Sequence, residues 1–390
     1  MIAVLIFAVA LVAGLLVSEF AERSVLSTAV FFLAAGVIAG RTGFGWIALS
    51  PQDPTVSRIA ELALFTVLFT DGMRIGARDL ASAWRLPGRA LFLGLPLTAF
   101  FMAVFARFVV QMPWEHAFLL AAVLVPTDPV FAAAIVGREE IPGRLRQLLN
   151  VESGLNDGLA LPFVVALVAT IASGPGADYG RIAEDLALGA IAGVGIPWVA
   201  LRIESLRIFA VARDLRPLFI FAIGLLVLGV GSVLRMNEFI AAFTAGVTVA
   251  TIAPGARDDF HRFGELIVEL LKLLALLVFG SLLSLDMFES VGWAGIAFAL
   301  LAIFIARPAA LEIVLLGSAL DRRERVTVSW FGPKGFASVV YGIYVLNSGI
   351  PRAVAMFLII AVAVAISIVL HSSTDVPIAR WFRRQEEGEE

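Results

Sequence analysis

Two carboxylates and an amide lie inside a segment of the chain that is otherwise strongly apolar. In order, the segment contains Glu152, Ser153, Asn156 and Asp157. A further acid, Asp128, lies upstream between Pro126 and Pro129. A charge at the centre of a bilayer costs roughly 2.5–3.5 kcal/mol even on the lenient insertion scale. Acids retained in such segments therefore predict a pathway for a cation or a proton.

Helix geometry sorts the four polar residues into two pairs. Glu152 and Asn156 are four residues apart, so they share one helix face. Ser153 and Asp157 have the same spacing and share the neighbouring face. Hard cations prefer oxygen ligands. We therefore expect Ser153 and Asp157 to offer oxygens to one cation, while Glu152 and Asn156 face a different partner.

An alternative is that the two acids of this segment are purely structural. Lys334 and Arg307 lie in later apolar segments and are their candidate partners. A buried charge is tolerated when it is paired. We adopt the structural interpretation for Glu152 and the ion-binding interpretation for Asp157.

The composition is typical of a membrane protein. Of the 390 residues, 60% are hydrophobic and 16% are charged, and the mean hydropathy is +0.95. Soluble domains carry about 25% charged residues. The absence of cysteine excludes disulfides, thiolate metal sites and cysteine nucleophiles. Residues 2–17 have no basic residue before them, so we expect a retained first span and not a signal peptide.

Apolar runs recur over the whole length and predict an all-α polytopic membrane protein. About thirteen spans are expected, since roughly 20 residues cross a bilayer. They lie near residues 2–17, 26–40, 58–73, 90–110, 117–137, 147–172, 183–201, 217–234, 238–252, 264–283, 291–318, 325–346 and 352–372.

The basic residues predict the orientation of these spans. With the C-terminus inside, about 20 of the 29 Lys and Arg residues fall in cytoplasmic loops and about five on the opposite side. This asymmetry favours an odd number of spans, with the N-terminus outside the cell membrane. We expect a short cytoplasmic tail at 374–390 and no appended regulatory domain.

An odd count predicts two inverted six-helix repeats, with the seventh span as a linker. The fifth span contains Pro126-Thr127-Asp128-Pro129, and its counterpart contains Gly332-Pro333-Lys334-Gly335. Proline removes a helix hydrogen bond and clashes with the preceding turn. Matched broken helices in inverted repeats are a sequence pointer to a transporter's binding site. We therefore expect the ion site where these two breaks cross.

These segments resemble the NhaP-type members of the monovalent cation:proton antiporter-1 family, which includes the eukaryotic Na⁺/H⁺ exchangers. The matching motifs are Thr127-Asp128-Pro129, Glu152 to Asp157, and Gly332 to Gly335, with weaker likeness at Leu68 to Gly72 and Glu238 to Gly246. The resemblance covers essentially the whole chain. It implies a secondary transporter, not an enzyme, that exchanges Na⁺, and also Li⁺, for H⁺ by alternating access without a cofactor.

The resemblance also implies the residues that bind the ions. Asp157 is the expected carboxylate for both the cation and the proton. Asp128, Ser153 and the Thr127 carbonyl would complete the coordination of Na⁺. Asp71 would supply a further oxygen from the third span. At the position of Asp71 the family more often has Glu, and the shorter Asp side chain reaches less far.

Four further residues are expected to support the site. Asn156 precedes Asp157, which is typical of electroneutral members and implies one proton per monovalent cation. Glu152 would pair with Lys334 or with Arg307. The family usually has Arg where this chain has Lys334, and a buried lysine can lose its proton whereas arginine effectively cannot. The lysine at position 334 therefore leaves open how many protons are exchanged per cation.

Family members are homodimers in which a core domain moves against a dimerisation domain. The resemblance implies that 1–75 and 180–285 form the dimerisation domain, and that 88–172 and 290–373 form the core. The expected partners are a monovalent cation, the proton, membrane lipid and a second copy of the chain, with no nucleic acid. The expected location is the inner cell membrane.

Other functions are weaker interpretations. A K⁺/H⁺ antiporter of the same fold is the main alternative, because K⁺ also binds among oxygens. A cation channel would need a filter loop or repeated subunits, and neither is indicated. A membrane metalloprotease would need His-Glu-x-x-His, which is absent.

Three charged residues share one stripe of the predicted span at 264–283. Glu265, Glu269 and Lys272 are spaced i, i+4 and i+7. Residues with this spacing are neighbours on a helix surface. We expect them to form an internal ion-pair ladder at the start of the span, and not a second pathway.

Overall fold

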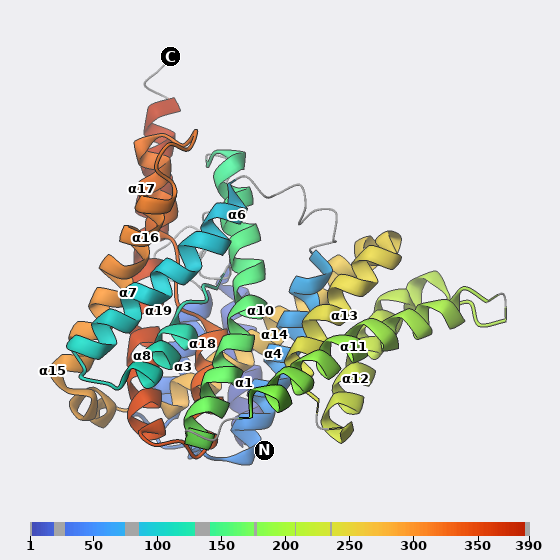
Figure 1. Ribbon diagram of the computed structural model, residues 1–390, viewed down its shortest axis with the longest axis horizontal. Coiled ribbons are helices and arrows are strands. Elements are labelled where there is room, and N and C mark those ends of the chain that lie inside the picture. Colours follow the sequence, from blue (N-terminus) through green and yellow to red (C-terminus); the bar gives the residue numbers. More distant parts are fainter. Residues whose placement is uncertain are drawn as a thin grey trace.

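The computed structural model describes residues 2–18, 28–74, 86–128, 141–174, 178–206, 208–234 and 236–386. All regular elements within these ranges are helical. Figure 1 shows them as a bundle with the two termini at opposite ends. The all-α expectation is therefore confirmed.

The helices of the first half coincide with the predicted spans. They are α1 (Ile2–Leu16), α3 (Thr28–Ala39), α4 (Pro54–Arg74), α6 (Pro87–Arg89), η1 (Ala90–Gly94), α7 (Leu95–Phe108), α8 (Trp114–Leu124) and α10 (Gly143–Ser173). The predicted span at 117–137 is covered by α8 only to Leu124, and its part from Pro129 onward lies outside the described residues.

The second half continues the same pattern. Its elements are α11 (Tyr179–Glu204), η4 (Arg213–Leu215), α12 (Arg216–Leu234), α13 (Glu238–Ile252), α14 (Pro254–Leu282), α15 (Leu285–Leu301), η5 (Ala302–Ala306), α16 (Arg307–Val314), α17 (Arg322–Trp330), α18 (Phe336–Asn347) and α19 (Ala353–Glu386).

Six helical stretches in the described ranges are long and apolar enough to cross a membrane. They are Pro87–Phe108, Gly143–Ser173, Tyr179–Glu204, Arg213–Leu234, Leu285–Val314 and Ala353–Thr374. Shorter apolar helices, α1, α3, α8, α13 and α18, lie among them. The exact number of crossings stays a prediction.

Several helices extend beyond the apolar segments that hydropathy detects. α14 begins at Pro254 instead of near residue 264, and α19 continues to Glu386 through most of the predicted tail. Residues 387–390 of that tail lie outside the described part. The added turns include charged residues, such as Arg257 and Asp259 in α14 and Arg383 and Arg384 in α19. They project from the bundle at the end where the C-terminus lies (Figure 1).

Two helix crossings reflect the predicted inverted repeat. α3 packs on α14 and α4 packs on α13, so the second predicted span of each repeat contacts the third span of the other. Glycines allow both approaches. A Cβ on Gly36 would lie 2.2 Å from the Leu277 carbonyl oxygen, and one on Gly72 would lie 2.4 Å from the Phe243 carbonyl oxygen.

The fourth predicted span of each repeat carries the same distortion. η1 (Ala90–Gly94) and η5 (Ala302–Ala306) are π-helical segments. Each is followed by a helix with proline at its second residue, Pro96 in α7 and Pro308 in α16. Proline cannot donate to the preceding turn, and a π-segment is one way in which a helix adjusts to this.

The two broken helices cross as predicted. α8 ends at Leu124 and continues as non-helical chain to Asp128, while residues 331–335 separate α17 from α18. The backbone N–H of Asp128 donates to the Pro333 carbonyl at 2.9 Å. Non-helical backbone is tolerated inside a membrane protein where other protein groups satisfy its polar atoms. The crossing provides such partners.

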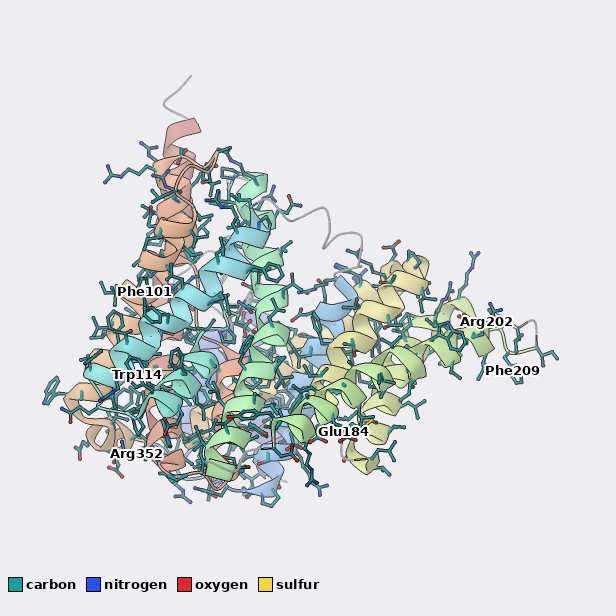
Figure 2. The ribbon with its side chains drawn as sticks, in the orientation of Figure 1. Phe101, Trp114, Glu184, Arg202, Phe209 and Arg352 are labelled. Carbon is teal, nitrogen blue, oxygen red and sulfur yellow. The ribbon has the colours of Figure 1, made fainter. Side chains whose placement is uncertain are left out.

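The remaining helices fall on two sides of α10. Figure 1 shows α11, α12 and α13 on one side, and α7, α15, α16 and α17 on the other. Figure 2 places Glu184 and Arg352 toward the end of the bundle opposite the C-terminus, and Arg202 near the far end of α11. The division into a core and a dimerisation domain stays a prediction.

Candidate ion-binding site

Asp128 lies at the crossing of the broken helices with both carboxylate oxygens engaged. Oδ1 accepts from Lys272 Nζ at 3.2 Å, and Oδ2 accepts from the backbone N–H of Phe336 at 3.1 Å. Phe336 begins α18, and the N-terminus of a helix stabilises a negative charge. A Cβ on Gly335 would lie 2.1 Å from the Asp128 Cβ, so this approach requires glycine.

A small polar network joins the break after α8 to the middle of α10. Asn156 Nδ2 donates to Thr127 Oγ1 at 2.6 Å, and Thr127 Oγ1 lies 3.1 Å from Ser153 Oγ. All three side chains are buried. The predicted ligands Thr127 and Ser153 are therefore adjacent. Asn156, which lies on α10 with Ser153, donates a hydrogen bond that holds the Thr127 hydroxyl in place.

Asp157 lies one turn from Ser153 and is 4% exposed. Its Oδ1 is buried without a hydrogen-bond partner among the described residues, and so is Asn156 Oδ1. The backbone carbonyl of Asp157 accepts from Tyr341 Oη at 2.8 Å. Leaving a buried acceptor unsatisfied is costly. An oxygen in this condition is a candidate ligand for a cation or a site for a proton.

Asp71 reaches the same region from α4. It is buried, and its Oδ1 lies 3.3 Å from Arg74 Nη1, which belongs to the last turn of that helix. The Asp71 carboxylate interacts electrostatically with Asp128 and with Lys272, and Asp157 interacts with all three. The helices α4, α10 and α14 and the break after α8 therefore bring these three acids and one ammonium together.

Glu152 forms its ion pair with Arg307. The guanidinium donates to Oε1 at 2.6 Å and to Oε2 at 3.1 Å, and also to the Phe331 carbonyl at 3.0 Å. Arg307 is the first residue of α16, and Phe331 follows α17. The pair thus fastens α10 to the second broken helix.

Lys334 was one of the two expected partners of Glu152, but it makes other contacts. Its Nζ donates to the Val125 carbonyl at 3.4 Å, and its backbone N–H donates to Ser367 Oγ at 2.8 Å. Of the two partners expected for Glu152, the structure has Arg307, and the pairing with Lys334 is wrong. Lys334 instead bonds one broken helix to the other at their crossing.

Comparison with known proteins identifies the family. The family model "Sodium/hydrogen exchanger, transmembrane" matches residues 7–381. The chain belongs to this family.

Two similar proteins are bacterial antiporters. The chain is 23% identical over 375 residues to "K(+)/H(+) antiporter NhaP2" of Shewanella oneidensis, covering 94% of this chain and 64% of that protein. It is 25% identical over 389 residues to "K(+)/H(+) antiporter NhaP" of Alkalimonas amylolytica, covering 97% of this chain and 66% of that one. The chain thus spans about two thirds of the length of these curated relatives.

A solved structure shares the fold. The sodium proton antiporter MjNhaP1 from Methanocaldococcus jannaschii superposes with a TM-score of 0.79 at 18% identity, over 97% of this chain and 98% of that one. The fold of this exchanger-family chain is therefore the NhaP fold.

Lys272 is the site residue that the sequence interpretation missed. The predicted ladder within the span at 264–283 is wrong, because Lys272 bonds to Asp128 while Glu265 bonds to Arg74 at 3.0 Å. α14 starts at Pro254, so Lys272 lies about 27 Å along the helix at 1.5 Å per residue. This depth places it among the acids. The one signal in the sequence was a lysine inside a long leucine-rich run.

Proposed function

We propose that this exchanger-family protein exchanges a monovalent cation for a proton across the membrane. The observation that carries the proposal is the buried Oδ1 of Asp157, which has no hydrogen-bond partner among the described residues. A bound cation or a proton would each satisfy this oxygen. Because both compete for one carboxylate, binding of one excludes the other, and exchange needs no further coupling device.

The proposed ligands of the cation are Asp157, Asp128, Ser153 and Thr127, with Asp71 contributing a further oxygen. Their burial supports this set, as does the contact between Thr127 and Ser153. Carboxylate, hydroxyl and carbonyl oxygens suit hard cations. We propose Na⁺ as the cargo, with Li⁺ accepted by the same oxygens.

A second group of residues is proposed to hold the ligands in place without binding the ion. Glu152 and Arg307 fasten α10 to the second broken helix. Asn156 fixes the Thr127 hydroxyl, and Lys334 joins the two breaks. Preorganised ligands with supporting contacts bind more selectively than mobile ones.

We further propose alternating access in an inner-membrane homodimer, with the N-terminus outside. Broken helices at the crossing of two inverted repeats are the feature of transporters that move one bundle against another. The core would comprise 88–172 and 290–373, and the dimerisation domain 1–75 and 180–285. The termini at opposite ends of the bundle support an odd number of crossings (Figure 1).

The proposed stoichiometry is one proton for one cation. Asn156 is a neutral residue beside Asp157, so α10 presents one acid to the ion and not two. The other two acids proposed as ligands have basic partners, Arg74 for Asp71 and Lys272 for Asp128. One uncompensated carboxylate accommodates one positive charge at a time.

K⁺/H⁺ exchange is a second candidate function. Two relatives that match over most of this chain are named K⁺/H⁺ antiporters, whereas the solved structure of the same fold is named a sodium proton antiporter. K⁺ binds the same classes of oxygen with longer bonds. The two cations differ in the spacing they require and not in the type of ligand.

The decisive experiment is dissipation of a pH gradient in proteoliposomes. Na⁺, Li⁺ and K⁺ chloride are added in turn to wild-type protein, with choline chloride as the control for ionic strength. We expect Na⁺ and Li⁺ to dissipate the gradient with saturation. A response to K⁺ alone would replace Na⁺ by K⁺ as cargo, and no response to any of the three would contradict the proposed antiport.

A further inference from the structure

Lys272 places a positive charge in the middle of α14, among acidic side chains. Its Nζ lies 3.2 Å from Asp128 Oδ1, and the two side chains are each 6% exposed. The ammonium also interacts electrostatically with Asp71 and Asp157. Charges in contact away from water attract far more strongly than at the surface. Lys272 is therefore part of the ion site, although none of the motifs of the sequence contains it.

The three acids proposed as ligands differ in how their charges are balanced. Asp71 has an ion pair with Arg74, and Asp128 has one with Lys272. Within the described ranges, Asp157 forms no ion pair, and its Oδ1 has no hydrogen-bond partner. Arg74 is shared with Glu265, and Glu269 also interacts with Lys272. Lys272 thus offsets part of the negative charge around Asp157, and Asp157 is the acidic ligand left for the cargo to pair with.

We propose that Lys272 is a built-in counter-ion that restricts the cargo to cations with a single charge; this inference rests on the proposed function. The ammonium occupies Asp128 Oδ1 and repels a second positive charge at the site. A divalent cation such as Ca²⁺ seeks two or more carboxylate ligands. With Lys272 on Asp128, Asp157 is the proposed acidic ligand that has no ion pair in the described part of the chain.

The side chain opposite Asp128 therefore determines which charge the site accepts. A neutral residue at position 272 would remove the positive charge from Asp128 Oδ1, so that Asp128 and Asp157 could both offer carboxylate oxygens to Ca²⁺. Arginine would keep the positive charge and a donor for Asp128. Glutamine would keep a donor but remove the charge, so these two substitutions separate the effect of charge from that of hydrogen bonding.

The test measures cation binding by thermal stabilisation of the purified full-length protein at alkaline pH. A ligand that binds the folded state raises the melting temperature with its concentration. Wild type, K272Q, K272M and K272R are titrated with NaCl, LiCl, KCl and CaCl₂ against choline chloride. We expect wild type and K272R to respond to a monovalent cation and not to Ca²⁺. The neutral variants should bind Ca²⁺ with an apparent affinity higher by about tenfold or more.

A second set of variants assigns the new binding to the ion site. Adding D157N to K272Q should abolish the Ca²⁺ response, because Asp157 would be one of its two carboxylates. K272M, which removes both the charge and the hydrogen-bond donor, is the second neutral variant if K272Q does not fold. A Ca²⁺ response that survives D157N would come from another part of the protein and would overturn the inference.

The remaining outcomes separate this inference from the proposed function. Neutral variants that bind a monovalent cation but no more Ca²⁺ than wild type would overturn the counter-ion role alone. An equal gain in Ca²⁺ affinity in K272R would also overturn the counter-ion role. So would a wild-type protein that binds Ca²⁺ with the same affinity as the monovalent cation. A wild-type protein without any monovalent response would overturn the proposed site, and this inference with it.

Discussion

The Arg307 guanidinium donates one hydrogen bond to each carboxylate oxygen of Glu152, at 2.6 and 3.1 Å. Both side chains are buried, and they belong to α16 and α10. A bidentate pair of this kind fixes direction as well as distance. It sets the angle at which α10, which carries Asp157, meets the second broken helix.

Breaking this pair should destabilise the protein strongly. Arg307→Met leaves the Glu152 carboxylate buried without its partner, and the loss of one member of a buried pair costs roughly 3–5 kcal/mol. We expect a melting temperature well below that of wild type in differential scanning fluorimetry, and below that of Lys334→Met. A melting temperature equal to wild type would show that the pair does not form.

The matched control for this prediction is the double variant Glu152→Leu with Arg307→Met. Replacing both members of a buried ion pair by apolar residues is often close to neutral. Recovery should be partial, because Arg307 also donates to the Phe331 carbonyl at 3.0 Å. If the double variant were no more stable than Arg307→Met, the loss would belong to the Phe331 contact.

Gly335→Ala should disrupt the crossing of the broken helices. Its Cβ would lie 2.1 Å from the Asp128 Cβ, so one of the two breaks must move. We expect loss of exchange and a lower melting temperature. Gly229→Ala in α12 is the control, since a Cβ there meets nothing within 4 Å. It should be neutral or raise stability by up to about 1 kcal/mol. Equal behaviour of the two variants would contradict the tight crossing.

Tyr341→Phe should remove a hydrogen bond that holds the backbone of Asp157 in place. The Tyr341 hydroxyl donates to the Asp157 backbone carbonyl at 2.8 Å from the facing helix α18. Removing one hydrogen bond costs about 1 kcal/mol. We expect a small loss of stability and slower exchange, measured in the same liposomes as wild type. Tyr344→Phe is the control, because Tyr344 is 37% exposed. A loss of the same size in both variants would argue against a specific contact.

The neutral Asn156 leads to a prediction about voltage. With one uncompensated carboxylate, the equilibrium cation ratio of wild type should not depend on an imposed membrane potential. Asn156→Asp adds a second acid, to which the Thr127 hydroxyl can donate. We expect the ratio of this variant to shift with potential. A shift already present in wild type would show that more than one proton moves per cation.

The broken helices were predictable because their signals are local. Pro126 and Pro333 interrupt apolar runs, and each lies close to a charged residue. The bilayer core contains no water to bond with the backbone N–H and C=O groups that a break exposes. Two breaks can supply these hydrogen bonds to each other. The contact between the Asp128 N–H and the Pro333 carbonyl is the result.

The partners of the buried charges were not predictable in the same way. Glu152 had two basic candidates, and its pairing with Arg307 depends on where α10 and α16 lie in space, which the sequence alone does not give. Lys272 was assigned to neighbours on its own helix, since spacing along a helix is the one geometry that a sequence reveals. Its partner Asp128 lies on another element, and the crossing of α14 with its neighbours brings the two together.

Helix ends were also missed for a physical reason. Hydropathy detects the part of a helix that contacts lipid, whereas charged turns such as those at the start of α14 continue it into water. α14 accordingly begins at Pro254, well before the predicted start near residue 264.

The central claim is that Asp157 binds the cation and the proton in turn. The most direct measurement is Na⁺-driven proton movement in proteoliposomes that contain wild type or Asp157→Asn at equal amounts, with folding checked by melting temperature and size-exclusion chromatography. The asparagine has nearly the same shape but carries no negative charge and cannot release a proton. We predict that wild type exchanges and that the variant remains folded but shows no exchange. Robust Na⁺-driven proton movement in Asp157→Asn would contradict the account.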